Sequence, residues 1–93
     1  MSSLHTLHLG TNAAVRRASD GAQPDDVLLL REDAVLLALG PQIANAPFAK
    51  IFALAADLDA RGIRSRLPAT VNVIDDSEFV ALTLQHERVI AWR

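Results

Sequence analysis

Histidine and aspartate are the residue types in this chain that could carry out acid–base or metal chemistry. His5 and His8 stand three positions apart, as two ligands of one metal ion might. The segment around them alternates as a β-strand does, and residues three apart on a strand point to opposite faces of the sheet. The two imidazoles then cannot coordinate the same metal ion, so a structural role is favoured over a metal site. His86 stands near the end of an expected helix, where binding to the helix carbonyls is favoured over catalysis.

Asp33 follows the apolar run of residues 27–30, which puts it at the expected carboxyl edge of a sheet. Open α/β folds bind ligands at that edge, so Asp33 is the best candidate for a functional carboxylate. A helix that begins there also needs an N-cap, and this structural role is favoured. The serines lack a G-x-S-x-G elbow, and the four glycines stand alone rather than in a phosphate-binding loop. The pattern therefore predicts no catalytic residue, no metal site and no cofactor.

The chain contains no cysteine. It can hold neither a disulfide nor a zinc–thiolate site, and it cannot carry a persulfide on its own side chains. The net charge of −2 gives no general attraction to a phosphate backbone, which disfavours direct binding to RNA. Arg61, Arg64 and Arg66 form a local basic cluster that could bind an acidic partner or a tRNA phosphate, but a solvated loop is the favoured interpretation.

Short apolar runs and helix signals alternate along the chain. Strands are expected at residues 4–8, 27–30, 50–55, 71–74 and 88–92, and helices at residues 13–19, 33–39, 57–61 and 75–85. Thr11 or Asn12 can cap the first helix, a D-x-x-E capping box starts the last one, and residues 42–47 are expected to form a loop. This order predicts a single α/β domain over residues 1–93, a three-layer α/β/α sandwich around a mostly parallel five-stranded sheet.

The sequence is 51% hydrophobic and only 22% charged, which is more apolar material than so small a monomer easily buries. The expected helix over residues 33–39 is apolar nearly all round, and that over 75–85 carries apolar residues outside a single stripe. The side chains predicted to contact a partner are Leu36, Leu37, Phe79, Val80, Leu84 and Trp92. Charged residues and prolines interrupt every apolar run, and no export signal precedes the first strand, so we expect a soluble cytoplasmic protein.

Four segments resemble the TusB/DsrH family. They are residues 4–7 (LHTL), 28–33 (LLLRED), 54–62 (LAADLDARG), and a closing segment with Ile74-Asp75, Phe79-Val80, Leu82-Thr83, His86 and Trp92. The resemblance implies a DsrE-like fold and a dimer of heterotrimers with TusC-like and TusD-like subunits, or their DsrF and DsrE counterparts. In the Tus system such a complex takes persulfide sulfur from TusA and passes it through TusE toward 2-thiouridine at the tRNA wobble position. In the Dsr system the sulfur traffic serves dissimilatory sulfur oxidation.

The chain departs from the family pattern at three places. Residues 14–18 lack the cysteine that some DsrH-type members carry on the first helix, Asp33-Ala34-Val35 replaces an Asp-Gly-Val, and Leu9-Gly10-Thr11 replaces an Arg-Ser-Pro. The resemblance then implies a non-catalytic subunit whose partners supply the reactive cysteines. Two alternatives remain at this point: an independent enzyme that uses Asp33 with a histidine, and a stand-alone homodimeric binding module.

Overall fold

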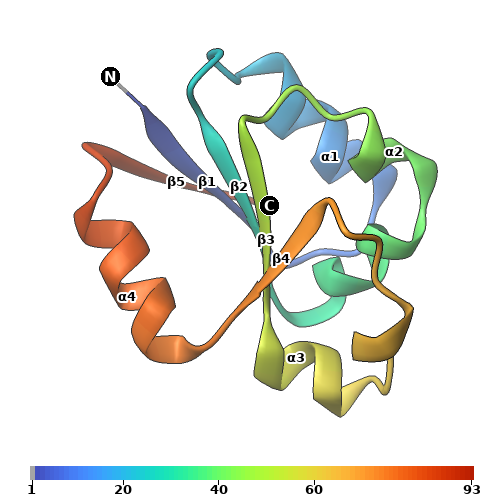
Figure 1. The fold of residues 1–93 in the computed structure, drawn as a ribbon. Helices are drawn as coiled ribbons and strands as arrows, with labels where there is room; N and C mark the ends of the chain where they lie inside the picture. The colour runs from blue at the N-terminus through green and yellow to red at the C-terminus, as the bar shows by residue number, and fades with distance from the viewer. Residues whose placement is uncertain (1) are drawn as a thin grey trace.

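The computed structural model describes residues 2–93, which form one five-stranded sheet with helices on both faces (Figure 1). The strands are β1 (Ser3–Leu7), β2 (Val27–Leu30), β3 (Lys50–Leu54), β4 (Val71–Ile74) and β5 (Arg88–Trp92). All neighbouring strands are parallel, in the order β4-β3-β2-β1-β5. The expected three-layer α/β fold is confirmed, and the sheet is parallel throughout its described strands.

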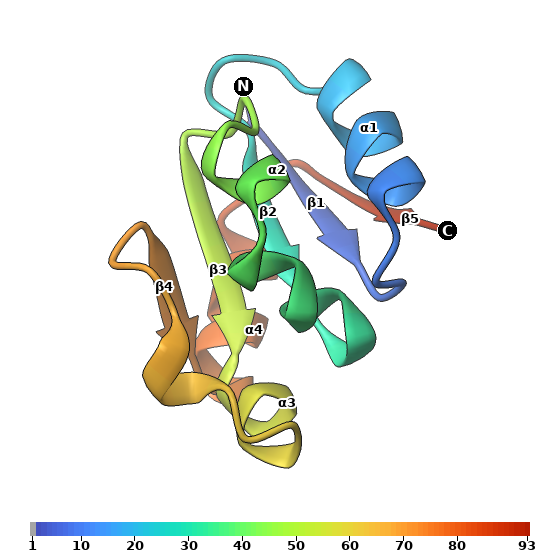
Figure 2. The ribbon, with the colours of Figure 1, turned by 90° about the vertical axis from the view of Figure 1, so that its right-hand side faces the viewer.

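The helices divide unequally between the two faces of the sheet. They are α1 (Asn12–Asp20), the 3₁₀ helix η1 (Glu32–Leu39), α2 (Pro41–Ala44), α3 (Ala55–Ala60), the 3₁₀ turn η2 (Arg64–Arg66) and α4 (Asp76–Leu84). In Figure 2, α1, α2 and η1 lie in front of the sheet and α4 lies behind it. Within residues 2–93, α4 is therefore the helix that covers the second face (Figure 2).

Two hydrophobic clusters fill the spaces between these layers. Alternate residues of each strand point to opposite faces, so that Leu7 and Leu28 join the larger cluster under α1 and η1, whereas Leu4 and Leu29 join the smaller cluster under α4. Every residue of β1 and β2 is buried. The continuous apolar run of β2 is what a central parallel strand with both faces covered requires.

The helix starts that carry polar caps lie where the sequence indicates. The Thr11 hydroxyl accepts a hydrogen bond from the backbone N–H of Ala14, which fixes the beginning of α1. At the start of α4, the Asp75 carboxylate accepts from the N–H of Glu78, and the Glu78 carboxylate accepts from the N–H of Asp75. This reciprocal pair confirms the expected capping box.

Two local expectations are wrong. Asp33 does not cap a helix: η1 is a 3₁₀ helix that starts one residue earlier, at Glu32, and has no side-chain cap. Residues 42–47 are not all loop, because Pro41 starts the short helix α2, where its fixed φ angle suits the first helical position. In residues 2–93, no helix combines the length and the apolar character that a bilayer crossing requires.

Candidate interaction surface

A buried polar cluster ties β5 and the start of β2 to strand β1, which lies between them. The His5 Nε2 atom lies 2.7 Å from Oδ2 of Asp26, and the Trp92 indole N–H donates to His5 Nδ1 at 2.8 Å. The His5 and Trp92 rings are nearly parallel, at 1° to each other, with centroids 6.0 Å apart. Asp26 also accepts from the backbone N–H groups of Ser3 and Gln23, at 2.8 and 2.9 Å. All three side chains are thus engaged within the chain.

The donors in this cluster fix the hydrogen positions on His5. An indole N–H can only donate, so His5 Nδ1 must be the acceptor, and Nε2 carries the hydrogen that is donated to Asp26. Burial acts to raise the pKa of Asp26, but the hydrogen bonds from Gln23, His5 and Ser3 together outweigh it and hold that pKa below its usual range. The cluster contains a base and a carboxylate but no nucleophile, and its His5 and Asp26 side chains are buried. Its geometry suits a structural role.

The carboxyl edge of the sheet holds Asp33, as the sequence indicates. Its carboxylate is exposed and accepts from Arg61 Nη2 at 2.7 Å, and Arg61 also lies 4.0 Å from the carboxylate of Asp57. Asp57 accepts from the backbone N–H of Glu32, which has the unusual φ of 51°. These charged groups bind one another, and in residues 2–93 no hydrogen bond or ion pair joins Asp33 to a histidine.

The basic cluster expected at residues 61–66 is partly neutralised. Arg61 pairs with Asp33, and Arg64 pairs with Asp59 at 3.1 Å. Exposed pairs of this kind add little to stability, but they place a carboxylate next to the guanidinium groups of Arg61 and Arg64. This arrangement supports the solvated-loop interpretation over a phosphate-binding patch.

Apolar side chains of α4 and β5 lie exposed on the face that α4 covers alone. Val80 and Leu84 stand four residues apart on one side of α4 and are 57% and 82% exposed. Val89 of β5 pairs in register with Leu4, so it faces the same layer, and it is 47% exposed. Five strands about 4.8 Å apart span roughly 19 Å, whereas one helix is about 10 Å wide, so α4 cannot cover this face completely.

A second apolar exposure lies on η1, on the opposite side of the sheet. Leu36 and Leu39 are 46% and 37% exposed. Their neighbour Leu37 instead packs against the larger hydrophobic cluster of the chain. The leucines of η1 are less exposed than Val80 and Leu84 of α4. The two exposed sides lie on opposite faces of the sheet.

The sequence prediction of contact residues thus divides into two groups. Leu36, Val80 and Leu84 are exposed and available to a partner. Leu37, Phe79 and Trp92 are partly buried: Phe79 packs on the smaller cluster, and Leu37 and Trp92 pack on the larger one. The sequence analysis did not single out Leu39 or Val89.

The polar cluster around His5 was also missed. One signal was present, because His5 alternates with Leu7 on a strand and should share its buried face. Nothing local in the sequence indicates its partners Asp26 and Trp92, which lie 21 and 87 residues away. His86, expected at helix carbonyls, instead lies with its Nδ1 2.8 Å from the Ser2 hydroxyl.

The side chains described so far offer little reactive chemistry. No group of three or more histidine, aspartate or glutamate side chains in residues 2–93 is arranged to hold a metal ion. Several large apolar side chains of η1, α4 and β5 are instead exposed. Fold and surface together define a small α/β protein with an all-parallel sheet and two uncovered apolar sides.

Comparison with known proteins gives the family. Residues 11–89 match the family described as DsrH like protein. The curated protein TusB of Escherichia coli O1:K1 is 37% identical over 99 residues, which cover 96% of this chain and 99% of that protein. Protein TusB of Escherichia coli K12 strain DH10B is 36% identical over the same shares. The chain therefore belongs to the TusB/DsrH family of sulfur-relay subunits, and its fold is DsrE-like.

Proposed function

We propose that this chain is a non-catalytic subunit of a sulfurtransferase complex, in which residues 1–93 act as one domain. Its partners are TusC-like and TusD-like subunits, or the corresponding DsrF and DsrE subunits, and the complex works in the cytoplasm. Transfer of sulfane sulfur needs a thiol that is first sulfurated and then attacked by the next thiol. This chain has no cysteine, so the thiols of the relay belong to its partners.

The exposure of Val80 and Leu84 on α4 carries the proposal. A fully buried leucine side chain stabilises an assembly by about 1.5–3 kcal/mol relative to an exposed one. Leu84 is 82% exposed, so burial against a partner would provide nearly all of this stabilisation. Leu36 on η1 offers a smaller apolar contact on the other side of the sheet. Two separate apolar sides suit a subunit that has two neighbours. Leu37, Phe79 and Trp92 support these surfaces from within, since each packs on the core.

Co-expression with the two partner subunits, followed by size-exclusion chromatography, tests the assembly. We expect the three chains to elute together, and we expect Leu84→Glu to release this subunit from the complex. Gln85→Glu is the matched control, because it adds the same charge to the next residue, which is already polar and exposed. Leu36→Glu tests the η1 side in the same way.

The isolated chain gives the reference for these runs. The same apolar sides can bring two copies together, so its own elution volume shows whether it forms a homodimer. Failure of the unaltered chains to elute together would end the proposal. If Leu84→Glu and Gln85→Glu reduce assembly equally, the apolar side of α4 is not part of the interface.

The relay that we propose is thiolation of the wobble uridine of tRNA, with this subunit contacting the tRNA only indirectly. The similarity to TusB over nearly the whole chain supports the Tus relay over a Dsr relay. Deleting the gene and measuring 2-thiouridine in digested tRNA by mass spectrometry separates the two. A normal 2-thiouridine content together with impaired sulfur oxidation would assign the chain to a DsrH-type complex.

The stand-alone enzyme built on Asp33 has no supporting observation in the structure. The Asp33 carboxylate pairs with Arg61, and the buried His5 pairs with Asp26 instead. A functional role for Asp33 at the sheet edge stays a prediction. A turnover by the isolated chain that Asp33→Asn abolishes would revive it.

A further inference from the structure

A cleft opens between α1 and α2, on the side of the sheet opposite α4. We refer to it as the α1–α2 cleft. Its volume is about 420 Å³, which lies in the range of small-molecule sites in proteins. Neither the apolar sides of α4 and η1 nor the polar cluster around His5 contributes to its lining.

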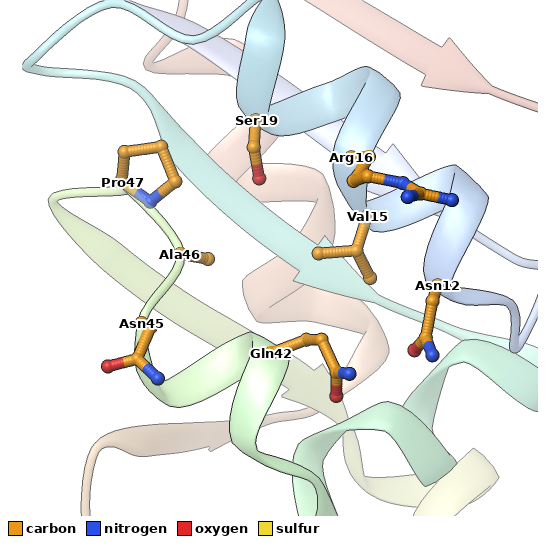
Figure 3. A pocket seen from close by; sticks show the side chains of 8 residues that line it. All are labelled: Asn12, Val15, Arg16, Ser19, Gln42, Asn45, Ala46 and Pro47. Atoms are coloured by element: carbon orange, nitrogen blue, oxygen red, sulfur yellow. The ribbon is translucent and has the colours of Figure 1, made fainter.

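The lining of the α1–α2 cleft is rich in hydrogen-bond donors and contains no carboxylate. Arg16 and Asn12 come from α1, and Gln42 comes from α2. Figure 3 shows the Gln42 side chain directed toward Asn12 and the Ser19 hydroxyl directed into the cleft from α1. In a chain with a net charge of −2, a cleft with one cation and no acid is a local exception. Such a lining favours an anion.

Arg16 is available to bind that anion. It is exposed, and no ion pair within residues 2–93 involves it. Asp20 lies one helical turn further along α1, but the two side chains do not pair. The guanidinium offers a planar fork of donors that matches a carboxylate or a phosphate.

The remaining wall of the cleft is apolar. Ala46 and Pro47 line the side opposite α1 (Figure 3). Val15 of α1 points toward the cleft but is only 4% exposed, because it belongs to the larger hydrophobic cluster. A bare inorganic anion would leave this wall in contact with water. An apolar or aromatic body attached to the anionic group would cover it and add hydrophobic stabilisation.

We propose that the α1–α2 cleft binds a small organic anion, with its carboxylate or phosphate group at Arg16 and its apolar body against Ala46 and Pro47. The site is independent of the proposed relay, because it uses neither the partner surfaces nor a thiol. Its lining favours a ligand that carries both an anionic group and an apolar body.

Amide NMR titration of the full chain tests the site with phenyl phosphate, benzoate, inorganic phosphate and the neutral benzamide. We expect saturable shifts at Val15, Ser19 and Ala46 with phenyl phosphate or benzoate, and weaker binding of inorganic phosphate and benzamide. Binding by phenyl phosphate alone or by benzoate alone identifies the head group. No saturable shift with either compound overturns the proposal, and so does benzamide binding as tightly as the anion that binds better.

Arg16→Gln gives an independent arm, with Arg17→Gln as its control. Arg17 is the adjacent exposed arginine of α1, but it does not line the cleft. We expect Arg16→Gln to weaken binding about tenfold or more, and Arg17→Gln to leave it nearly unchanged. Equal weakening by both variants would show general charge attraction and would overturn the site. The comparison of benzoate with benzamide needs no variant, so the test holds even if a substitution disturbs folding.

Discussion

The Trp92 indole N–H donates to Nδ1 of His5 at 2.8 Å, joining two residues that lie 87 positions apart in the chain. Trp92 pairs in register with Leu7, so its side chain reaches back along β1 by two residues to find the imidazole. The hydrogen bond therefore connects the edge strand β5 to β1, next to the centre of the sheet. Because His5 is fully buried, any change that leaves its Nδ1 without a donor is costly.

Trp92→Phe removes this donor and keeps an aromatic ring. We expect the free energy of unfolding to fall by about 1–3 kcal/mol, because a buried acceptor loses its partner. Urea denaturation followed by far-UV circular dichroism measures the change. Val89→Ala, on the same strand but exposed, should cost much less. A Trp92→Phe protein as stable as the original would show that the hydrogen bond contributes nothing.

Asp26→Asn tests the carboxylate of the same cluster through pH. The pKa of Asp26 is lowered in the folded chain, so its contribution to stability is present above the unfolded pKa of about 3.9 and is lost as pH falls below it toward the folded pKa. We expect Asp26→Asn to be less stable at neutral pH and to lose less stability on acidification. Urea titrations across pH 2–7 measure both effects.

Asp25→Asn is the control for this experiment, since Asp25 is the exposed neighbour of Asp26. The pKa of Asp75 is also lowered, by the Glu78 N–H and the Ser77 hydroxyl, so part of the acid dependence must survive in Asp26→Asn. An acid dependence identical to that of the unaltered chain would contradict the role assigned to Asp26.

Gly10→Ala tests a close approach of two backbones at the carboxyl edge. A Cβ at Gly10 would lie 2.8 Å from the carbonyl oxygen of Asp33, so one backbone segment must shift. We expect a loss of about 1–3 kcal/mol, the usual range for overpacking. Gly40→Ala is the control, because its Cβ would lie 3.3 Å from the flexible end of Gln42 and 3.6 Å from the Leu37 carbonyl oxygen, which is an ordinary contact. Thermal unfolding that gives the same midpoint for both variants would refute the close approach.

Asp75→Ala tests the capping box of α4. The substitution frees the N–H of Glu78, and we expect the free energy of unfolding to fall by about 1 kcal/mol. Asp76→Ala, one residue further along and without a capping bond, is the comparison. Because α4 carries Val80 and Leu84, a frayed helix should also weaken binding to the partner subunits. If Asp75→Ala costs no more than Asp76→Ala, the cap does not stabilise α4.

The sequence predicted the sheet well because its signals are local. Residues 27–30 form an unbroken apolar run, and such a run suits a strand buried on both faces. The capping box at Asp75 and Glu78 likewise depends on residues three apart. The sequence did not give the helix type of η1, because the same apolar residues suit an α-helix. Its 3₁₀ form begins at Glu32, whose positive φ no local pattern indicates.

The candidate surface was only partly predictable. Apolar side chains on η1 and α4 indicated an uncovered side, and Leu36, Val80 and Leu84 are exposed. Trp92 looks equally available in the sequence, yet its indole is held by His5. That contact depends on β5 lying beside β1, and strand order is a property of the whole chain rather than of any segment.

Tracing labelled sulfur tests the central claim most directly. The complex is loaded with ³⁵S from a cysteine desulfurase, and its subunits are separated without reductant. The account predicts label on a cysteine-bearing partner and none on this chain, alone or in the complex. Covalent ³⁵S on this chain, or transfer of sulfane sulfur by it with no partner present, would contradict the account.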